Sequence, residues 1–388
     1  MRTSVVITAV LALLGLGGTA FGHPAPVPLG CDGNWHRQDT PNRAHDGGDY
    51  NQLAAVDAVS STDVWGVGVV DDFDAPKPGY RTLIEHYDGV GWSGVPSPND
   101  SRSTWNVLAG VSASGPQDVW AVGSLNTSPY YSLIEHWDGF GWSIAQSGRV
   151  NTYLTSVAAL APDDVWAAGS TNYVGKGLLV HWDGTAWRRT ELPAAIVFRA
   201  ITALGPDDIW AVGQESTAQF LDLTVAYHYD GTSWTQEATP SPLRIHSEDE
   251  NWLTSVTAVS TDDVWATGIA RDPDWGIRDH PFTVHWDGSS WSTVRTPDPG
   301  GQTDDTDLWS SVAFGSTDVY AVGSQGSEPD WRTFTLHWDG GSWTEVPSTV
   351  NGRFLGLASD ETGALWAVGE APVNHPFRGT ATLGAHRC

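Results

Sequence analysis

The chain repeats one pair of short segments along most of its length. Six times, a segment close to Asp-Val-Trp-Ala-Val-Gly is followed by a segment that ends in His-Trp-Asp-Gly-x-x-Trp, with small variations. Successive first segments start 55, 46, 44, 55, 55 and 46 residues apart, the last interval leading to a degenerate seventh copy. Their starts are Asp63, Asp118, Asp164, Asp208, Asp263, Asp318 and Ala364. This spacing is typical of one four-stranded propeller blade per repeat.

Each repeat supplies four β-strands. An apolar Leu-x-x-Val segment, such as Leu154 to Val157, precedes the Val-Trp-Ala-Val segment, which is apolar on both faces. Such a strand suits blades that stack face to face. The third strand ends at the His-Trp pair, and the fourth starts at the Trp after Asp-Gly, where glycine accepts the positive φ of a tight hairpin. We predict an all-β, seven-bladed β-propeller with four-stranded antiparallel blades.

The two ends of the chain are expected to share the last blade. The seventh repeat stops at Cys388, in the strand where every other repeat reaches its histidine. At the other end, Cys31 to Trp35 reads Cys-Asp-Gly-Asn-Trp and resembles the missing turn and fourth strand. We therefore predict that residues 31–388 form one domain. The two cysteines of the chain, Cys31 and Cys388, then become neighbours and are predicted to form a disulfide that locks the ring.

The N-terminal segment predicts export. Arg2 is followed by an apolar stretch and then by small residues up to Gly22, which is typical of a signal peptide over residues 1–22, cut between residues 22 and 30. No later window holds roughly 18 consecutive apolar residues, so no membrane anchor is expected. The net charge of −27 repels a nucleic-acid backbone and favours solubility outside the cell. We expect a secreted, extracellular, monomeric protein without nucleic-acid or membrane partners.

The repeats resemble those of secreted actinobacterial seven-bladed propellers over residues 31–388. Two segments, 137–143 and 286–292, are also similar to the Trp-Asp-Gly-x-x-Trp-Ser turns of bacterial tectonin-like propeller lectins. This second resemblance implies sugar binding, but the rest of the lectin repeat is absent, so no binding residue is transferred from it. The sialidase Asp-box fails to match in spacing. Kelch-type copper oxidases need a cysteine bonded to a tyrosine, whereas both cysteines here are assigned to the disulfide.

One face of the predicted ring is expected to carry the functional site. The short turns share one face, and the long, dissimilar connections share the other, which we call the long-loop face. Function usually resides on loops held by a rigid scaffold. Aromatic rings on these loops can stack on sugar C–H faces while charged groups bind hydroxyls, so we predict a carbohydrate ligand. The predicted ligand-binding residues are Tyr131, Trp252, Trp275, Trp309, Trp331, Arg332 and Arg353. The same connections also carry Tyr130, Tyr153, Asp304, Asp305 and Asp307.

Four alternatives to a carbohydrate-binding protein stay open. The acidic loops can be merely solvated, with tryptophans that cap the blades, and the propeller can serve as a protein-interaction scaffold. A polysaccharide lyase would need a Tyr or His base beside an Arg that neutralises a uronate. Its candidate catalytic residues are Tyr80, Arg81, Arg278, His280, His375 and Arg378. A glycoside hydrolase would instead need two carboxylates at a fixed separation. Signatures of serine hydrolases, phosphate loops and zinc sites are absent from the sequence.

The repeated histidines are predicted to be structural. They recur once per blade and are therefore spread around the ring, so each is expected to form a hydrogen bond with a neighbouring strand rather than to bind a metal. They are His86, His136, His181, His228, His285 and His337. We predict no cofactor. Structural calcium stays open at three acidic segments, 72–74, 272–274 and 304–307, although none has the glycine and distal glutamate of an EF-hand loop.

Overall fold

A computed structural model of the chain describes ten stretches of sequence. They are residues 32–42, 50–72, 78–125, 130–171, 175–217, 221–243, 249–272, 278–301, 303–373 and 379–388. All regular secondary structure in them is β-strand. In the same stretches no helix has the length and apolar character needed to cross a bilayer. The predicted signal peptide, Cys31, Trp275, His375 and Arg378 lie outside the described residues.

Four sheets contain four strands each. The first holds β2(Asn51–Ser60), β3(Asp63–Asp71), β4(Tyr80–Tyr87) and β5(Trp92–Gly94). The second holds β6(Asn106–Gly115), β7(Asp118–Leu125), β8(Tyr131–Trp137) and β9(Trp142–Val150). The third holds β21(Thr306–Gly315), β22(Asp318–Gln325), β23(Arg332–Trp338) and β24(Trp343–Glu345). The fourth joins both ends of the chain, in the order β1(His36–Gln38), β27(Gly379–Arg387), β26(Leu365–Val373) and β25(Arg353–Ser359).

The remaining sheet has eleven strands, and its pairing divides it into three groups of the same order. The first group is β10(Thr152–Ala161), β11(Asp164–Thr171), β12(Lys176–Trp182) and the first half of β13(Trp187–Gly205). The second group is the rest of β13 with β14(Asp208–Ser216), β15(Asp222–Tyr229) and β16(Trp234–Glu237). The third group is β17(Glu250–Ser260), β18(Asp263–Asp272), β19(Arg278–Trp286) and β20(Trp291–Val294). Only the pair Asp222–Glu250 joins β15 to β17.

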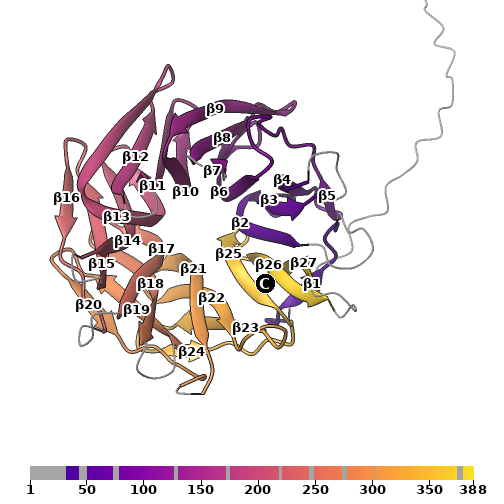
Figure 1. The fold of residues 1–388 in the computed structure, drawn as a ribbon. Coiled ribbons are helices and arrows are strands. Elements are labelled where there is room, and N and C mark those ends of the chain that lie inside the picture. The colour runs from indigo at the N-terminus through magenta and orange to yellow at the C-terminus, as the bar shows by residue number, and fades with distance from the viewer. Residues whose placement is uncertain are drawn as a thin grey trace, which may run out of the picture.

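The sheets surround a central opening (Figure 1). The strands β2, β6, β10, β17, β21 and β25 lie nearest to this opening, and the strands paired onto each of them lie farther out. Antiparallel four-stranded sheets arranged radially in this way form a β-propeller. The predicted all-β propeller class is therefore confirmed.

The Asp-Gly pairs form the predicted tight turns between the third and fourth strands of a group. Their glycines have φ values between 79° and 90°, in the left-handed region that favours glycine. They are Gly89, Gly139, Gly184, Gly231, Gly288 and Gly340. The aspartate closes each turn. In one of them, the Asp138 carboxylate accepts the backbone N–H groups of Phe140 at 2.9 Å and Gly141 at 3.1 Å.

The repeated histidines bind the aspartate that starts the second strand of their own group. The distance from histidine Nε2 to aspartate Oδ1 is between 2.6 and 2.8 Å in all six pairs. In one of them, His136 pairs with Asp118 and stacks on Trp120, whose indole N–H also donates to Asp118 at 3.2 Å. The prediction of a structural role is confirmed, because these contacts join neighbouring strands.

Tryptophans fill the space between neighbouring sheets. Trp65 of β3 is 2% exposed and contacts Trp137 and Trp142 of the next sheet, with ring centres 5.0 and 5.5 Å away. Trp210 of β14 is fully buried and contacts Trp286 of the third group in the same manner, at 5.2 Å. Most tryptophans are therefore core residues, as predicted, and they hold the sheets at fixed angles around the opening.

Both chain ends contribute to one sheet. His36 of β1 pairs with His386 of β27 in antiparallel register. Just before β1, the Gly33 N–H donates to the Cys388 carbonyl at 3.1 Å, and Arg387 Nε donates to the Gly33 carbonyl at 2.8 Å. The segment before β1 thus resembles the repeated Asp-Gly turn, as expected. This pairing completes the sheet of β25 to β27.

The disulfide between Cys31 and Cys388 stays a prediction, because Cys31 lies outside the described residues. Gly33 is two residues from Cys31 and is hydrogen-bonded to Cys388. We expect the unreduced protein to be lighter than the reduced protein by the mass of two thiol hydrogens, and peptide mapping to link the two cysteines. Reduction should lower the free energy of unfolding by about 6 kcal/mol in the chain-entropy description. Alkylation of both thiols without a reductant would contradict the prediction.

Candidate functional site

The innermost strands carry a repeated buried residue. This residue is Leu or Phe and is at most 2% exposed in every group. The set is Leu53, Leu108, Leu154, Phe198, Leu253, Leu308 and Phe354. In every group the pairing with the second strand shifts register directly after this residue, so the next residue is the extra residue of a β-bulge. The residues directly before and after it differ in type from group to group. The repeat thus fixes the backbone while these two positions are free to differ.

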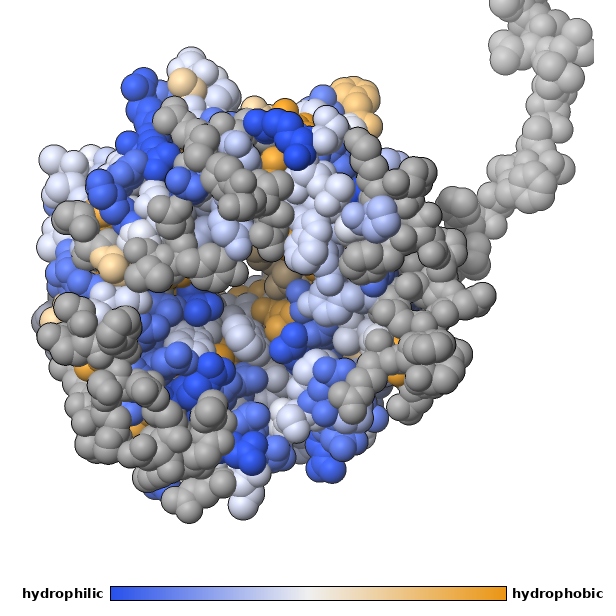
Figure 2. All heavy atoms as spheres, in the orientation of Figure 1, coloured by the Kyte–Doolittle hydropathy of each residue, from blue (hydrophilic) through white to orange (hydrophobic). Residues whose placement is uncertain are grey.

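The position after the buried residue lines a central cavity of about 190 Å³. The residues there are Ala54, Ala109, Thr155, Arg199, Thr254, Trp309 and Leu355. The position before it lies one step nearer the long-loop face, and we call this set the rim. The rim consists of Gln52, Val107, Tyr153, Val197, Trp252, Asp307 and Arg353. Figure 2 shows a hollow at the centre of the molecule, with hydrophobic residues in its depth and hydrophilic residues farther out on the same face.

A second cavity of about 380 Å³ adjoins the central one. Its lining combines two tyrosine rings with hydroxyl, amide and guanidinium groups: Val107, Ser124, Tyr130, Tyr153, Thr155, Val197, Arg199 and Gln214. These residues come from β6, β7, β10, β13 and β14 and from the residue before β8. Thr155 and Arg199 belong to both cavities. We call this second cavity the tyrosine pocket. Its volume is within the range of small-molecule sites.

Arg199 is held in a fixed orientation at the boundary of the two cavities. Its Nε donates to Gln214 Oε1 at 2.7 Å, and Gln214 Nε2 donates to Asp222 Oδ2 at 2.9 Å. Its guanidinium lies over the ring of Trp252, 5.2 Å from the ring centre. Among the described residues, no carboxylate lies within ion-pair distance of Arg199. Burial lowers the pKa of the Arg199 guanidinium from its usual value.

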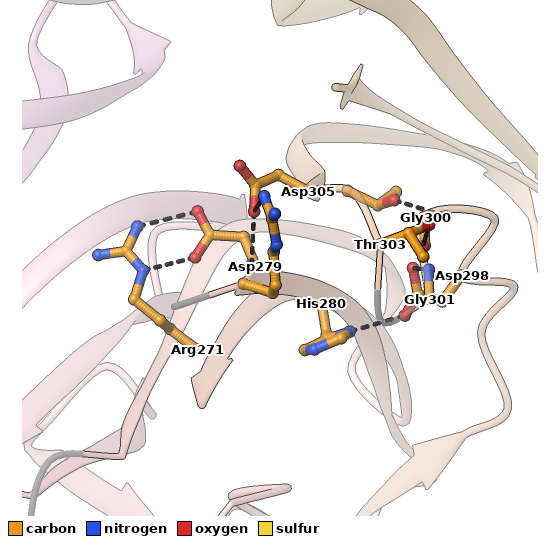
Figure 3. A network of polar contacts seen from close by, with 10 residues as sticks. Arg271, Asp279, His280, Asp298, Gly300, Gly301, Thr303 and Asp305 are labelled. Atoms are coloured by element: carbon orange, nitrogen blue, oxygen red, sulfur yellow. Dashed lines mark hydrogen bonds and ion pairs between the residues drawn. The ribbon is translucent and has the colours of Figure 1, made fainter. Parts of the chain in front are cut away.

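Arg271 also lies over Trp252, at 5.0 Å, but its charge is compensated. Asp279 accepts two hydrogen bonds from it, at 2.5 and 2.8 Å, and Glu250 accepts a third at 3.0 Å. Figure 3 shows the paired oxygens of Asp279 facing the Arg271 guanidinium. The hydrogen bond with Asp279 is the main reason why the pKa of Arg271 is raised. Two guanidinium groups therefore share one tryptophan, and only one of them has counter-charges.

The rim residue Asp307 forms an acidic cluster with Asp279 and Asp305. The Asp279 N–H donates to Asp305 Oδ1 at 3.2 Å, and Arg278 lies 3.7 Å from the same oxygen. Asp307 accepts a hydrogen bond from the Ser324 hydroxyl at 3.3 Å. Burial, followed by the charges of Asp279 and Asp305, raises the pKa of Asp307 to about 7. A carboxyl group that titrates near neutral pH suits general acid–base chemistry.

The candidate lyase residues lie in two separate parts of the ring. Tyr80 and Arg81 begin β4, where Tyr80 contacts Trp105 and Arg81 donates to the Thr104 carbonyl at 3.1 Å. Arg278 and His280 belong to β19, and His280 Nδ1 lies 2.7 Å from Asp298 (Figure 3). Figure 1 shows β4 and β19 on opposite sides of the opening. The structure therefore does not bring these four residues together as one base and arginine pair.

The predicted ligand-binding residues are only partly brought together. Trp252 and Arg353 lie on the rim, and Trp309 lines the central cavity. Arg353 forms an ion pair with Glu370 and lies over Trp331 at 4.5 Å. The other two described residues of the set, Tyr131 and Arg332, belong to β8 and β23, at the start of each strand. Tyr131 lies beneath the Arg102 guanidinium at 5.3 Å, and Arg332 is exposed.

The calcium prediction gains no support from the described residues. Within them, no group of three or more His, Cys, Asp or Glu side chains is arranged to hold a metal ion. This includes the segment 304–307. Asp74 and Asp274, which belong to the other two acidic segments, lie outside the described residues.

Sequence reasoning missed the two residues that define the charge of the tyrosine pocket, Arg199 and Gln214. The predicted site residues were taken from the long connections, whereas Arg199 and Gln214 lie within the strands β13 and β14. One signal was present: Arg199 occupies the position that is Ala54 and Ala109 in the first two groups. Arg199 is the one charged residue among the seven at this position, and a charge there indicates a local function.

A further cavity of about 420 Å³ lies farther from the opening. It opens between the β10–β13 group and the β13–β16 group, beside the short turn at 230–233. Its lining is Trp166, Leu179, His181, Arg188, Thr190, Leu192, Tyr229, Thr232, Ser233 and Trp234. We call it the outer cavity. It shares no residue with the tyrosine pocket.

Comparison with known proteins supports the fold and little more. No protein-family model matches the sequence, and no curated protein does either. A solved structure described as "YCF48 bound to D1 peptide" has a TM-score of 0.56 at 13% identity and covers 95% of this chain and 100% of its own. The WD40 propeller domain of Doa1 has a TM-score of 0.56 at 9% identity and covers 91% and 96%. An ulvan lyase bound to an oligosaccharide has 0.55 at 11% and covers 87% and 93%.

At such low identities these likenesses establish a β-propeller and leave its activity open. The tectonin resemblance and the alternative of a protein-interaction scaffold both stay predictions.

Proposed function

We propose that this chain is a secreted, extracellular seven-bladed propeller that binds a carbohydrate in the tyrosine pocket. The observation that carries the proposal is the pocket itself. It has about 380 Å³ of space, two tyrosine rings and a small set of polar groups on the long-loop face. Protein sites for sugars need this combination, because a pyranose has apolar C–H faces and polar edges.

The rigid framework supports this assignment. Tyr153 and Thr155 are separated by Leu154, which is 2% exposed and anchored between sheets. Gln214 is 9% exposed and is hydrogen-bonded on both sides, to Arg199 and Asp222. A site whose groups are already positioned loses less conformational entropy on binding. The ulvan lyase mentioned above is an example of a propeller that holds a glycan, and its likeness to this chain extends to the fold alone.

Seven blades and a shared last blade are part of the same proposal. The sequence contains seven copies of the second-strand segment, and each falls in a separate group of four strands. The pairing of β1 with β27 joins the two chain ends within the last of these groups. With β1 added, the last group has four strands like the others, and β1 covers the edge of β27.

The test is a screen of the exported protein against a glycan array and insoluble polysaccharides, followed by calorimetry with the best ligand. Tyr153→Ala is expected to weaken binding by about tenfold or more, because it removes an aromatic contact at the centre of the site. Phe140→Ala is the matched aromatic control, since Phe140 is 93% exposed in a short turn on the other face. It should bind as the unaltered protein does.

Two results would contradict this assignment. One is the absence of retention on any glycan. The other is full binding by Tyr153→Ala together with loss of binding in Trp234→Ala, which alters the outer cavity. The second result would place the sugar in the outer cavity, between the β10–β13 group and the β13–β16 group.

A second function, glycoside hydrolysis on the same face, is favoured by one observation. Asp307 has its pKa raised to about 7 beside Asp279 and Asp305, and a hydrolase needs one protonated and one ionised carboxyl group. Release of reducing ends that is lost in Asp307→Asn and retained in Asp304→Asn would establish it. A lyase would instead produce unsaturated, ultraviolet-absorbing ends. Absence of both products from every bound polysaccharide would leave a binding protein.

A further inference from the structure

The charge of Arg199 is the least compensated feature of the tyrosine pocket. Nε is its only hydrogen-bonded nitrogen among the described residues, and the partner is the uncharged amide of Gln214. The nearest carboxylates are already engaged. Asp222 accepts from Gln214 and Ser216, and Glu250 accepts from Arg271. The two terminal nitrogens of Arg199 therefore retain their hydrogen-bonding capacity toward the cavity that they line.

Arg199 is only partly exposed in the cavities that it lines, and its surroundings favour an anionic ligand. A guanidinium that leaves water needs an anionic partner, or it loses hydration without compensation. The contact with Trp252 compensates in part. The charge of Arg271, on the same tryptophan, acts in the opposite direction, and burial is the main cause of the lowered pKa of Arg199. An anion bound in the pocket would meet a preoriented donor pair.

We propose that the tyrosine pocket selects a sugar that carries a carboxylate, that is, a uronic acid residue, with the carboxylate on Nη1 and Nη2 of Arg199. This inference rests on the proposed carbohydrate function and adds the class of sugar. Carboxylate and guanidinium groups are both planar and form paired hydrogen bonds of matching spacing. The two tyrosines then face the sugar ring, and Ser124 and Thr155 lie within the same lining.

The overall charge of the protein further restricts the class of acidic ligand that can bind. The net charge of −27 repels a long polyanion as a whole. One uronate in a mostly neutral chain, or a short acidic oligosaccharide, experiences less of this repulsion and still reaches Arg199. The pocket thus fits isolated acidic residues better than a densely charged polymer.

The test compares matched pairs of oligosaccharides by calorimetry at one ionic strength. Each pair consists of a tetrasaccharide that contains galacturonic or glucuronic acid and its carboxyl-reduced, neutral counterpart. The unaltered protein is expected to bind the acidic member about tenfold more tightly or better, as a charged hydrogen-bonded pair provides. Arg199→Gln should bind both members equally, and Arg199→Lys should retain part of the preference. Arg295→Gln is the matched control, because Arg295 is an exposed arginine outside the pocket, and it should retain the full preference.

The outcomes separate this inference from the proposed function. Equal affinity of the unaltered protein for both members, with both affinities lost in Tyr153→Ala, overturns the selection of a carboxylate and leaves carbohydrate binding intact. Absence of binding to all members, or binding that Tyr153→Ala does not affect, overturns both. The comparison within the unaltered protein decides the question even if Arg199→Gln does not fold.

Discussion

Trp35→Ala is expected to lower the free energy of unfolding by about 3 to 5 kcal/mol, the usual loss for a large buried aromatic residue. Trp35 is 3% exposed, and its ring lies 4.9 Å from that of Phe354 in β25. Its indole N–H donates to the Thr335 hydroxyl at 3.1 Å. Thr335 belongs to β23, in the neighbouring sheet. One side chain from the residue before β1 thus joins two sheets of the ring.

The measurement is urea unfolding of the purified protein, followed by tryptophan fluorescence and circular dichroism. Phe140→Ala serves as the control, because this residue is 93% exposed and should change stability by less than about 0.5 kcal/mol. A Trp35→Ala variant that unfolds at the same urea concentration as the unaltered protein would show that the N-terminal segment does not complete the last sheet.

The free energy of unfolding of Asp57→Ser, taken relative to that of the unaltered protein, is expected to be about 3 kcal/mol higher above pH 6 than at pH 4. Asp57 is half-buried on β2, and its carboxylate accepts the N–H groups of Ala58 at 2.9 Å and Ala113 at 2.7 Å. Burial raises its pKa to about 6 from a usual value of 3.8. In the next group, the Ser112 hydroxyl occupies the same register position and accepts the N–H of Ala159 at 3.1 Å. Serine therefore retains the contact between sheets without the desolvated charge.

The sign follows from proton linkage. Between the two pKa values the folded protein holds the Asp57 proton and the unfolded chain has released it, so stability falls as the pH rises. This loss begins near pH 4, is complete above pH 6 and is absent from Asp57→Ser. Two other carboxyl groups act in the same direction, since desolvation raises the pKa of Glu135 to about 8 and that of Asp307 to about 7.

The difference in unfolding free energy between the unaltered protein and Asp57→Ser, measured from pH 4 to pH 8, isolates the contribution of Asp57. A difference that does not change with pH would contradict a desolvated, protonatable Asp57. Asp39→Ser, at an exposed position, is a control in which little pH dependence is expected.

The strand framework could be predicted from the sequence because each element carries its own local signal. β8 ends at Trp137 and β9 begins at Trp142, as the turn motif predicted. The long strand β13 is different, because it continues through Pro193 and serves two groups. Proline cannot donate to the ladder, and the pairing with β12 shifts register there, between Leu178 and Lys176. Local propensity alone does not reveal such a continuation.

The site could be predicted only to the level of a face. Arg199 obtains its properties from Gln214 and Trp252, which lie on two other strands, and from Asp222 on a third. No spacing in the sequence links these residues, because only the fold brings them together. Tyr80 in β4 and His280 in β19 carried plausible chemistry, yet these two strands lie on opposite sides of the opening. The sequence shows which side chains are present, but it does not show which of them lie close together in the fold.

The most direct test of the central claim is a crystal structure of the protein with the tightest-binding acidic oligosaccharide. We expect the sugar in the tyrosine pocket, with a pyranose ring against Tyr130 or Tyr153 and its carboxylate on Arg199. Density for the sugar in the outer cavity beside Trp234, or on the face of the short turns, would contradict the claim.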